Sequence, residues 1–350
     1  MSDQTIPKSA PFQAMQRGGV IPAHPLALNA KRELDERRQR ALSRYYLDAG
    51  SIGLAVGVHT TQFEVRKHGL LAPVLELAAQ EAADHASEPF LVAGAIGKTD
   101  QALSDAQLAK DLGYHAVLLG LAALHDADED ALIAHCQAVA QVMPVIGFYL
   151  QPAVGGQTLT YSFWRRFAQI DNVVAIKIAP FNRYKTLDVV RAVVDARAED
   201  RITLYTGNDD HIVADLLTAF TFPRDGEDVS VRIKGGLLGH WAVWTKRAVE
   251  LMDEIHSNAS QRSVQEWLAL DGRTTDANGV LFDVANDFAG CIAAIHEVLR
   301  RQGLLEGTWC LNPSETLGPG QMDELDRIYR DYPELNDDAF VAANLERWLQ

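Results

Sequence analysis

The chain has 350 residues, of which 47% are apolar and 23% are charged, a composition typical of a globular protein with one large domain or two ordinary ones. Its net charge of −15 and its lack of a long Lys/Arg run disfavour binding to nucleic acid or to an anionic membrane. No apolar run has the length of a membrane span, and the first residues lack the apolar segment of a signal peptide, so we expect a soluble cytoplasmic protein.

Three cysteines, Cys136, Cys291 and Cys310, lie far apart in the sequence. Their odd number and wide spacing predict no disulfide framework and match no metal-binding motif. We therefore expect a reducing compartment, and the sequence gives no indication of a metal or another cofactor.

Short apolar runs rich in β-branched residues recur along the chain and predict buried strands. These eight runs cover residues 19–24, 52–59, 90–97, 115–121, 143–150, 172–179, 201–207 and 229–234. Amphipathic stretches between them, such as 70–86 and 186–200, predict helices. Eight alternating units favour a closed (β/α)8 TIM barrel. An open doubly wound sheet is the alternative, but no G-x-G-x-x-G motif follows a predicted strand to support it.

The eighth run is followed by further helical stretches, so the sequence predicts two regions. Residues 1–240 would form the barrel with an N-terminal extension, and residues 241–350 a helical region packed on it. Within the second region we expect helices over 242–256, 263–271 and 279–303, with two more near the C-terminus. These helices would cap the barrel, pack in an oligomer, or both.

The predicted strand VVAIKIAP contains a lysine, Lys177, among apolar residues. Side chains alternate along a strand, so Lys177 would be the last interior residue near the C-terminal mouth of a barrel, where barrel enzymes keep their chemistry. Burial lowers a lysine pKa and exposes the neutral amine that attacks carbonyl groups. A lysine reaching out to water, or paired with a carboxylate, is the alternative.

Tyr149 precedes Lys177 by one strand–helix unit, so we expect both side chains to project into the same mouth. A phenol beside an imine-forming lysine can move the protons that this chemistry requires. A core or rim aromatic residue is the alternative for Tyr149.

Together these residues resemble the motifs of a known family. Y-L-Q-P (149–152) followed by I-K (176–177) resembles the Y-N-x-P and G-[IV]-K motifs of the dihydrodipicolinate synthase / N-acetylneuraminate lyase superfamily. GVHTTQFE (57–64) is similar to the family's G-T-T-G-E, and TGNDD (206–210) to its S-G-D-D. The resemblance runs from about residue 19 to residue 303 and implies a class I, Schiff-base-forming barrel.

The resemblance implies roles for individual residues. Lys177 would form the imine, Tyr149 would relay protons, and Thr60 would hydrogen-bond that tyrosine. Thr61 would bind the carboxylate of a 2-oxo acid, beside His59 and Gln62, which replace glycines of the family motif. Members of this family also suggest a homo-oligomer, a dimer or a tetramer.

Other departures from the family pattern argue against lysine biosynthesis. Val154 stands where dihydrodipicolinate synthases have an arginine, and the usual acidic pattern after the lysine is absent. Beyond the 2-oxo acid, we expect the pocket to be lined by residues that follow the fourth to eighth strands, namely Leu121, Val154, Arg183, Asn208, Gly235 and Gly236. Arg183 would hold an anionic or hydroxylated tail; without it, an apolar or aromatic aldehyde becomes the better expectation.

Other polar residues fall near predicted strand ends, namely His59, Asp209, Asp210, His211 and His240. Their spacing matches no metal motif, and a metal-dependent aldolase or amidohydrolase is kept as an alternative. Lys234, on the eighth predicted strand, is a second candidate amine.

The sequence thus predicts a class I lyase or aldolase acting on a pyruvate-like 2-oxo acid. A dehydratase acting on a sugar-derived 2-oxo acid, and a non-catalytic ligand-binding barrel, remain the alternatives.

Overall fold

The structure, a computed structural model, describes residues 7–350. The first six residues of the expected N-terminal extension lie outside this range. The strands are β1 (Val20–Pro22), β2 (Gly53–Val56), β3 (Phe90–Ala95), β4 (Ala116–Leu119), β5 (Val145–Leu150), β6 (Val173–Ala179), β7 (Thr203–Thr206), β8 (Ala219–Arg224) and β9 (Glu227–Leu238).

Within residues 7–350, thirteen α-helices accompany the strands. They are α1 (Ala10–Arg17), α2 (Glu36–Ala49), α3 (Leu71–Ala83), α4 (Thr99–Asp111), α5 (Glu129–Ala140), α6 (Tyr161–Phe167), α7 (Arg183–Asp195), α8 (Ile212–Leu217), α9 (Thr245–Asn258), α10 (Val264–Leu281), α11 (Cys291–Arg301), α12 (Gln321–Asp331) and α13 (Asp338–Trp348). Within residues 7–350, none of the helices combines the length and hydropathy needed to cross a membrane.

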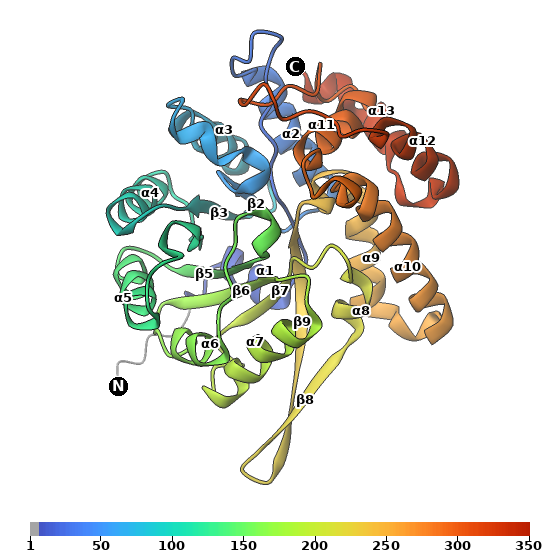
Figure 1. Cartoon of the computed structure of the whole chain (residues 1–350). Coiled ribbons are helices and arrows are strands. Elements are labelled where there is room, and N and C mark those ends of the chain that lie inside the picture. The colour runs from blue at the N-terminus through green and yellow to red at the C-terminus, as the bar shows by residue number, and fades with distance from the viewer. Residues whose placement is uncertain (1–6) are drawn as a thin grey trace.

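Eight parallel strands form a nearly closed barrel surrounded by helices, which confirms the predicted TIM barrel (Figure 1). The strands follow the order β1-β9-β7-β6-β5-β4-β3-β2. The ring closes between its two ends, because the His24 backbone N–H donates to the Ala55 carbonyl at 2.8 Å and Ala23 bridges Ala55 in parallel. Closure leaves no free sheet edge and places all eight C-terminal strand ends at one mouth.

Side-chain capping starts several of the ring helices where the sequence changes from loop to amphipathic pattern. Asp35, Asp128, Thr160 and Asn182 each accept a hydrogen bond from a backbone N–H in the first turn of the following helix. These bonds satisfy donors that have no partner within the helix, so each short connection ends at a defined residue.

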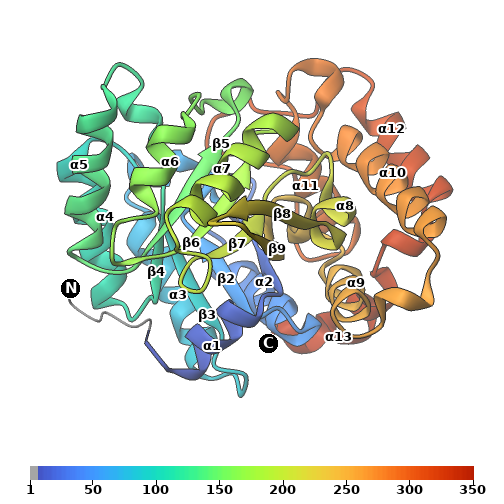
Figure 2. The ribbon, with the colours of Figure 1, turned by 90° about the horizontal axis from the view of Figure 1, so that it is seen from below.

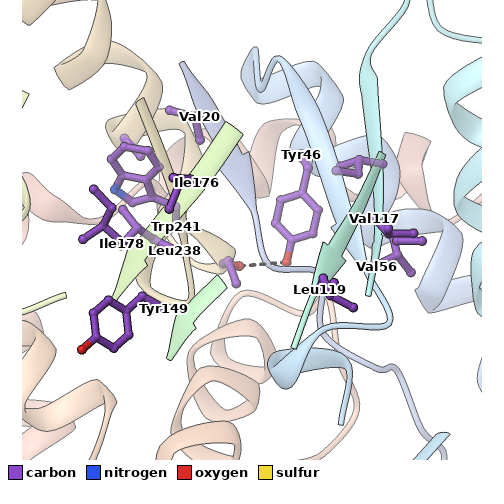
Figure 3. Close-up of a cluster of buried hydrophobic side chains, with 14 of the residues drawn as sticks. Val20, Tyr46, Val56, Val117, Leu119, Tyr149, Ile176, Ile178, Leu238 and Trp241 are labelled. Carbon is purple, nitrogen blue, oxygen red and sulfur yellow. Dashed lines mark hydrogen bonds between the residues drawn. The ribbon is translucent and has the colours of Figure 1, made fainter. Parts of the chain in front are cut away.

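Two layers of apolar side chains fill the molecule. The outer layer lies between the strands and the helices, and Figure 3 shows part of it, including Tyr149, Ile176 and Ile178. The inner layer fills the barrel and includes Phe148 and Tyr205. Helix α1 packs against this inner layer at the N-terminal end of the strands.

The eighth barrel strand differs from the prediction of 229–234. Residues 227–232 of β9 pair antiparallel with β8 in a hairpin that projects beyond the barrel (Figure 1), and only the following residues join the ring. The turn between the strands is Asp225-Gly226, with both φ angles positive. A D-G pair between alternating strands is a hairpin signal, so this arm was readable from the sequence.

The C-terminal region differs from the prediction in two places. Helix α9 packs against α2 and β1 as the eighth helix of the ring, so the additional helices begin with α10 rather than at residue 241. The expected helix over 279–303 is interrupted by a loop from 282 to 290. Asp283, Asp287 and Phe288 in this loop have φ angles near +50° to +70°, a conformation that cannot continue a right-handed helix.

The additional helices gather on one side of the barrel (Figures 1 and 2), and a buried carboxylate helps to hold them there. Asp337, just before α13, accepts hydrogen bonds from the Tyr45 hydroxyl at 2.8 Å, the Lys246 backbone N–H at 3.0 Å and the Gln302 amide at 2.8 Å. These donors belong to α2, α9 and the end of α11, so one side chain joins the barrel to its C-terminal cover.

We expect Asp337→Ala to lower the free energy of unfolding by about 2–4 kcal/mol, because it leaves buried donors without an acceptor. Urea denaturation followed by circular dichroism measures the change. Asp323→Ala removes an exposed carboxylate of α12 and serves as the control, with an expected change within about 0.5 kcal/mol. Equal stability of the two variants would contradict the role given to Asp337.

Candidate active site

Lys177 lies inside the barrel, near the C-terminal end of β6. In the parallel register it stands opposite Phe148 of β5 and Tyr205 of β7, both interior residues. Its Nζ lies 4.4 Å from the centroid of the Phe148 ring. The side chain is only 8% exposed, and among residues 7–350 it forms no ion pair within 4.0 Å.

This burial lowers the pKa of Lys177, and the negative charge of Asp209 opposes the shift without cancelling it. A buried ammonium without a close carboxylate costs several kcal/mol. The lysine therefore carries a larger neutral fraction near pH 7 than an ordinary lysine, and a neutral amine is the nucleophilic form.

A cavity surrounds the end of the Lys177 side chain, with about 60 Å³ open to the centres of water molecules. Its lining comes from the C-terminal ends of the strands and from the segment joining α10 to α11. The lining residues are Ala23, Val58, His59, Thr60, Phe148, Leu150, Gln151, Val154, Lys177, Ala179, Phe181, Gly207, Asp209, Gly239, Phe282, Phe288, Cys291 and Ile295.

Asp209, in the loop after β7, is the acidic residue of this lining. Burial raises the pKa of its carboxyl, while the nearby Lys177 lowers it to a smaller extent. The His240 backbone N–H donates to its carboxylate at 3.4 Å, and the Asn278 amide donates to its backbone carbonyl at 2.6 Å. The end of β9 and helix α10 thus hold Asp209 beside the lysine.

His59 and Thr60 enter the cavity from a 3-10 turn that follows β2. Burial lowers the pKa of His59 to about 4, with a further contribution from the positive charge of Lys177. His59 is therefore a neutral imidazole near pH 7, able to donate through one ring nitrogen and accept through the other.

Gly207 leaves the space that the lysine side chain occupies. A Cβ atom at this position would lie 2.6 Å from the Lys177 Cε and 2.8 Å from the Ala179 Cβ. Contacts this short do not occur between real side chains, so a larger residue would displace the lysine or the end of β6.

The C-terminal segment closes the cavity with apolar side chains, including Phe282, Phe288 and Ile295. The Phe288 ring meets the Phe181 ring edge to face, with centroids 6.1 Å apart. Both phenylalanines have positive φ angles, 67° and 49°, which costs of order 1 kcal/mol or more for a bulky residue. Strained residues of this kind concentrate at functional sites.

A comparison with protein families assigns the chain to one of them. The model of the dihydrodipicolinate synthetase family matches residues 16–221, more than half of the chain. The chain belongs to this family. Among curated proteins, 4-hydroxy-tetrahydrodipicolinate synthase of Oceanobacillus iheyensis is 22% identical over 269 residues, which cover 73% of this chain and 88% of that protein. The corresponding enzyme of Desulforudis audaxviator is 29% identical over 199 residues, 55% of this chain and 63% of its own length.

Solved structures of the dihydrodipicolinate synthetase family show the same fold. Dihydrodipicolinate synthase of Thermotoga maritima superposes with a TM-score of 0.73 at 18% identity, over 91% of this chain and 99% of that one. N-acetylneuraminate lyase of Fusobacterium nucleatum gives 0.70 at 17% identity, over 90% and 99%.

The predicted position of Tyr149 is wrong. Phe148 stands opposite Lys177, so Tyr149 points to the outside of the barrel, where its ring packs against Trp164 and it lies outside the cavity lining (Figure 3). Its hydroxyl donates to the Leu159 carbonyl at 3.0 Å and accepts from the Leu159 N–H at 3.2 Å. An extra residue in β6, at the register shift opposite Val145 and Ile146, breaks the simple alternation on which the prediction relied.

Thr61 and Gln62 hydrogen-bond to backbone groups of the protein, whereas the resemblance implied that they bind the carboxylate of the substrate. The Thr61 hydroxyl accepts from the Gly57 N–H at 2.9 Å and donates to the His24 carbonyl at 2.6 Å, which ties the ends of β1 and β2 together. Gln62 accepts from the Leu311 N–H at 2.6 Å. Its φ of 67° keeps the left-handed backbone for which the family has a glycine.

Arg183 and Asn208 lie behind the cavity rather than in its lining. The Arg183 guanidinium pairs with the fully buried Asp215 at 2.5 Å, and the Asn208 amide donates to the same carboxylate at 2.9 Å and to the Thr186 hydroxyl at 3.1 Å. These bonds fix the loops after β6 and β7. Arg183 therefore does not line the cavity, where it was expected to bind an anionic tail of the substrate.

Gly235 and Gly236, expected in a turn at the mouth, lie within β9 opposite Tyr205 and Thr206 and outside the cavity lining. The Lys234 ammonium donates to the Gln16 carbonyl at the end of α1, away from the Lys177 cavity. In the part of the chain that the structure describes, no group of three or more His, Cys, Asp or Glu side chains could hold a metal ion.

We expect Gly207→Ala to displace the Lys177 side chain and to reduce its reactivity about 100-fold, since misplacement by 1 Å can have this effect. The measurement is the rate at which the lysine reacts with a carbonyl compound, with thermal unfolding as the check on the fold. Gly272→Ala, at an exposed position of α10 with free space around it and no positive φ, serves as the control. Unchanged reactivity in Gly207→Ala would contradict the assigned role.

Proposed function

We propose that this protein is a class I lyase that holds a pyruvate-like 2-oxo acid as an imine with Lys177. The observation that carries the proposal is a buried, unpaired lysine with a lowered pKa at the C-terminal mouth of a TIM barrel. The names of relatives support it, because they include an N-acetylneuraminate lyase and a dihydrodipicolinate synthase solved in complex with pyruvate.

The first steps require only groups that line the cavity. The neutral Lys177 amine attacks the keto carbon, and the carbonyl oxygen takes up a proton to give a carbinolamine. Loss of that oxygen as water, with a second proton, leaves the protonated imine. The imine then accepts the electron pair released when a bond from the third carbon, either to hydrogen or to the fourth carbon, breaks, and this gives an enamine.

We propose Asp209 as the group that moves these protons. Its raised pKa makes a protonated carboxyl available near neutral pH, and the carboxylate formed after proton release stabilises the cationic imine. Thr60 and His59 line the same cavity and supply short-range hydrogen bonds to the substrate. Tyr149 is excluded from this step by its position outside the barrel.

Bond cleavage, condensation and dehydration share this imine, so a dehydratase on a sugar-derived 2-oxo acid is the alternative within the same mechanism. A non-catalytic barrel is the alternative outside it, and its support is that Thr61 and Gln62 hydrogen-bond to backbone groups of the protein.

Incubation with pyruvate and borohydride should add one reduced pyruvyl group to Lys177, located by peptide mass spectrometry. Lys177→Ala should lose the adduct and all turnover while remaining folded, because removing a buried amine also removes its desolvation cost. Lys234→Ala, at the other end of the barrel, should retain the adduct. An adduct on Lys234, or none in the wild type, would refute the proposal.

The pH dependence of trapping tests Asp209. The rate should rise with pH as Lys177 loses its proton, because only the neutral amine attacks. Asp209→Asn removes the charge that raises the lysine pKa, so this rise should move to lower pH while the maximal rate falls about 100-fold.

Asp228→Asn, at an exposed position of the hairpin outside the cavity lining, should leave both the rise and the maximal rate unchanged. A pH profile in Asp209→Asn that coincides with the wild type would rule out Asp209 as the acid–base group.

A further inference from the structure

A second cavity of about 180 Å³ lies beside the lysine cavity, at the same end of the barrel. Its lining comes from the segments that follow β2, β3, β4 and β5. The lining residues are Phe63, Ile96, Gly97, Gly120, Leu121, Ala122, Ala123, Phe148, Leu150, Gly156, Gln157 and Leu159.

The two cavities are neighbours that share walls. Phe148 and Leu150 line both of them, and the Lys177 Nζ lies 4.4 Å from the centre of the Phe148 ring. A second contact joins the lysine cavity to its neighbour, because the rings of His59 and Phe63 meet edge to face at 5.7 Å. A chain that extends from a carbon bound to Nζ therefore starts beside the wall of the second cavity.

The walls of the second cavity are apolar. No charged residue lines it, and its one polar side chain, Gln157, already donates its amide to the Leu121 carbonyl at 3.1 Å. A carboxylate or a row of hydroxyls placed there would give up hydration without gaining partners. A hydrocarbon group would instead gain about 25 cal/mol for each Å² of apolar surface removed from water.

We propose that the second cavity binds the distal part of the substrate, and that this part is an aromatic or branched aliphatic group. The inference rests on the proposed imine at Lys177 for the position of the 2-oxo acid. This apolar group replaces the anionic tail that the sequence predicted. The arginine expected to bind such a tail is held by Asp215 outside the cavity lining.

Borohydride trapping with three 2-oxo acids tests this assignment: pyruvate, 4-phenyl-2-oxobutanoate and 2-oxoglutarate. The half-saturating concentration should be about 100-fold lower for the phenyl compound than for 2-oxoglutarate, which carries a carboxylate at the corresponding position. Equal values for the two, or a preference for 2-oxoglutarate, would overturn the proposal.

A filling substitution provides a matched test. Ala122 lines the second cavity at an exposed turn, so Ala122→Trp should fill the cavity without disturbing the core. It should raise the half-saturating concentration of the phenyl compound at least 10-fold and leave that of pyruvate unchanged. Ala131→Trp, at an exposed position of α5 outside the cavity lining, is the control and should change neither. Equal effects of the two substitutions would refute the assignment.

Calorimetric titration separates this inference from the proposed function. The Lys177→Ala protein cannot form an imine, yet it should still bind 4-phenyl-2-oxobutanoate, and Ala122→Trp in that background should weaken the binding. If pyruvate is not trapped but this binding is intact, only the proposed Lys177 imine is refuted. If pyruvate is trapped but Ala122→Trp has no effect, only binding of the distal group in the second cavity is refuted.

Discussion

The burial of the Lys177 amine, without a carboxylate in contact, is the constraint on which the site depends. An ammonium in this position is costly, and the cost appears as a lowered pKa rather than as an ion pair. Several features of the surrounding structure are needed to maintain it. Gly207 gives the side chain room, Phe148 covers its end, and Asp209 lies close enough to affect its charge without forming an ion pair.

The C-terminal helices close the lysine cavity, which the strands of the barrel alone would leave open. The loop between α10 and α11 brings Phe282 and Phe288 over the mouth, and Asn278 of α10 fixes the backbone of Asp209. These residues leave only a small cavity around the lysine, and its low polarity strengthens the electrostatic interactions inside it. The helices are thus part of the site, and their attachment through Asp337 connects the stability of the fold to the chemistry of Lys177.

Three polar residues of the family motifs make contacts other than those that the motif resemblance implies. Thr61, Gln62 and Asn208 keep the positions that motif resemblance gives them, but their side chains bond to backbone or to other buried groups. The polar groups left to the cavity are few, and its neighbour is apolar. The second cavity therefore suits an apolar group better than the anionic group that a free arginine would bind.

The sequence by itself indicated the parallel barrel, because eight apolar β-branched runs alternate with helical stretches and no G-x-G-x-x-G motif supports the open doubly wound sheet. It also predicted Lys177 as an interior residue, with a lysine reaching out to water as the alternative, and the structure buries its side chain. It could not determine that Phe148 replaces Tyr149 beside the lysine. That choice depends on one extra residue in the pairing of β5 with β6, and a shift of one position moves every side chain to the opposite face. Contacts between distant segments, such as Asn278 with Asp209 and Gln62 with Leu311, were decided only by the tertiary structure, because local patterns carry no information on which loops meet at the mouth.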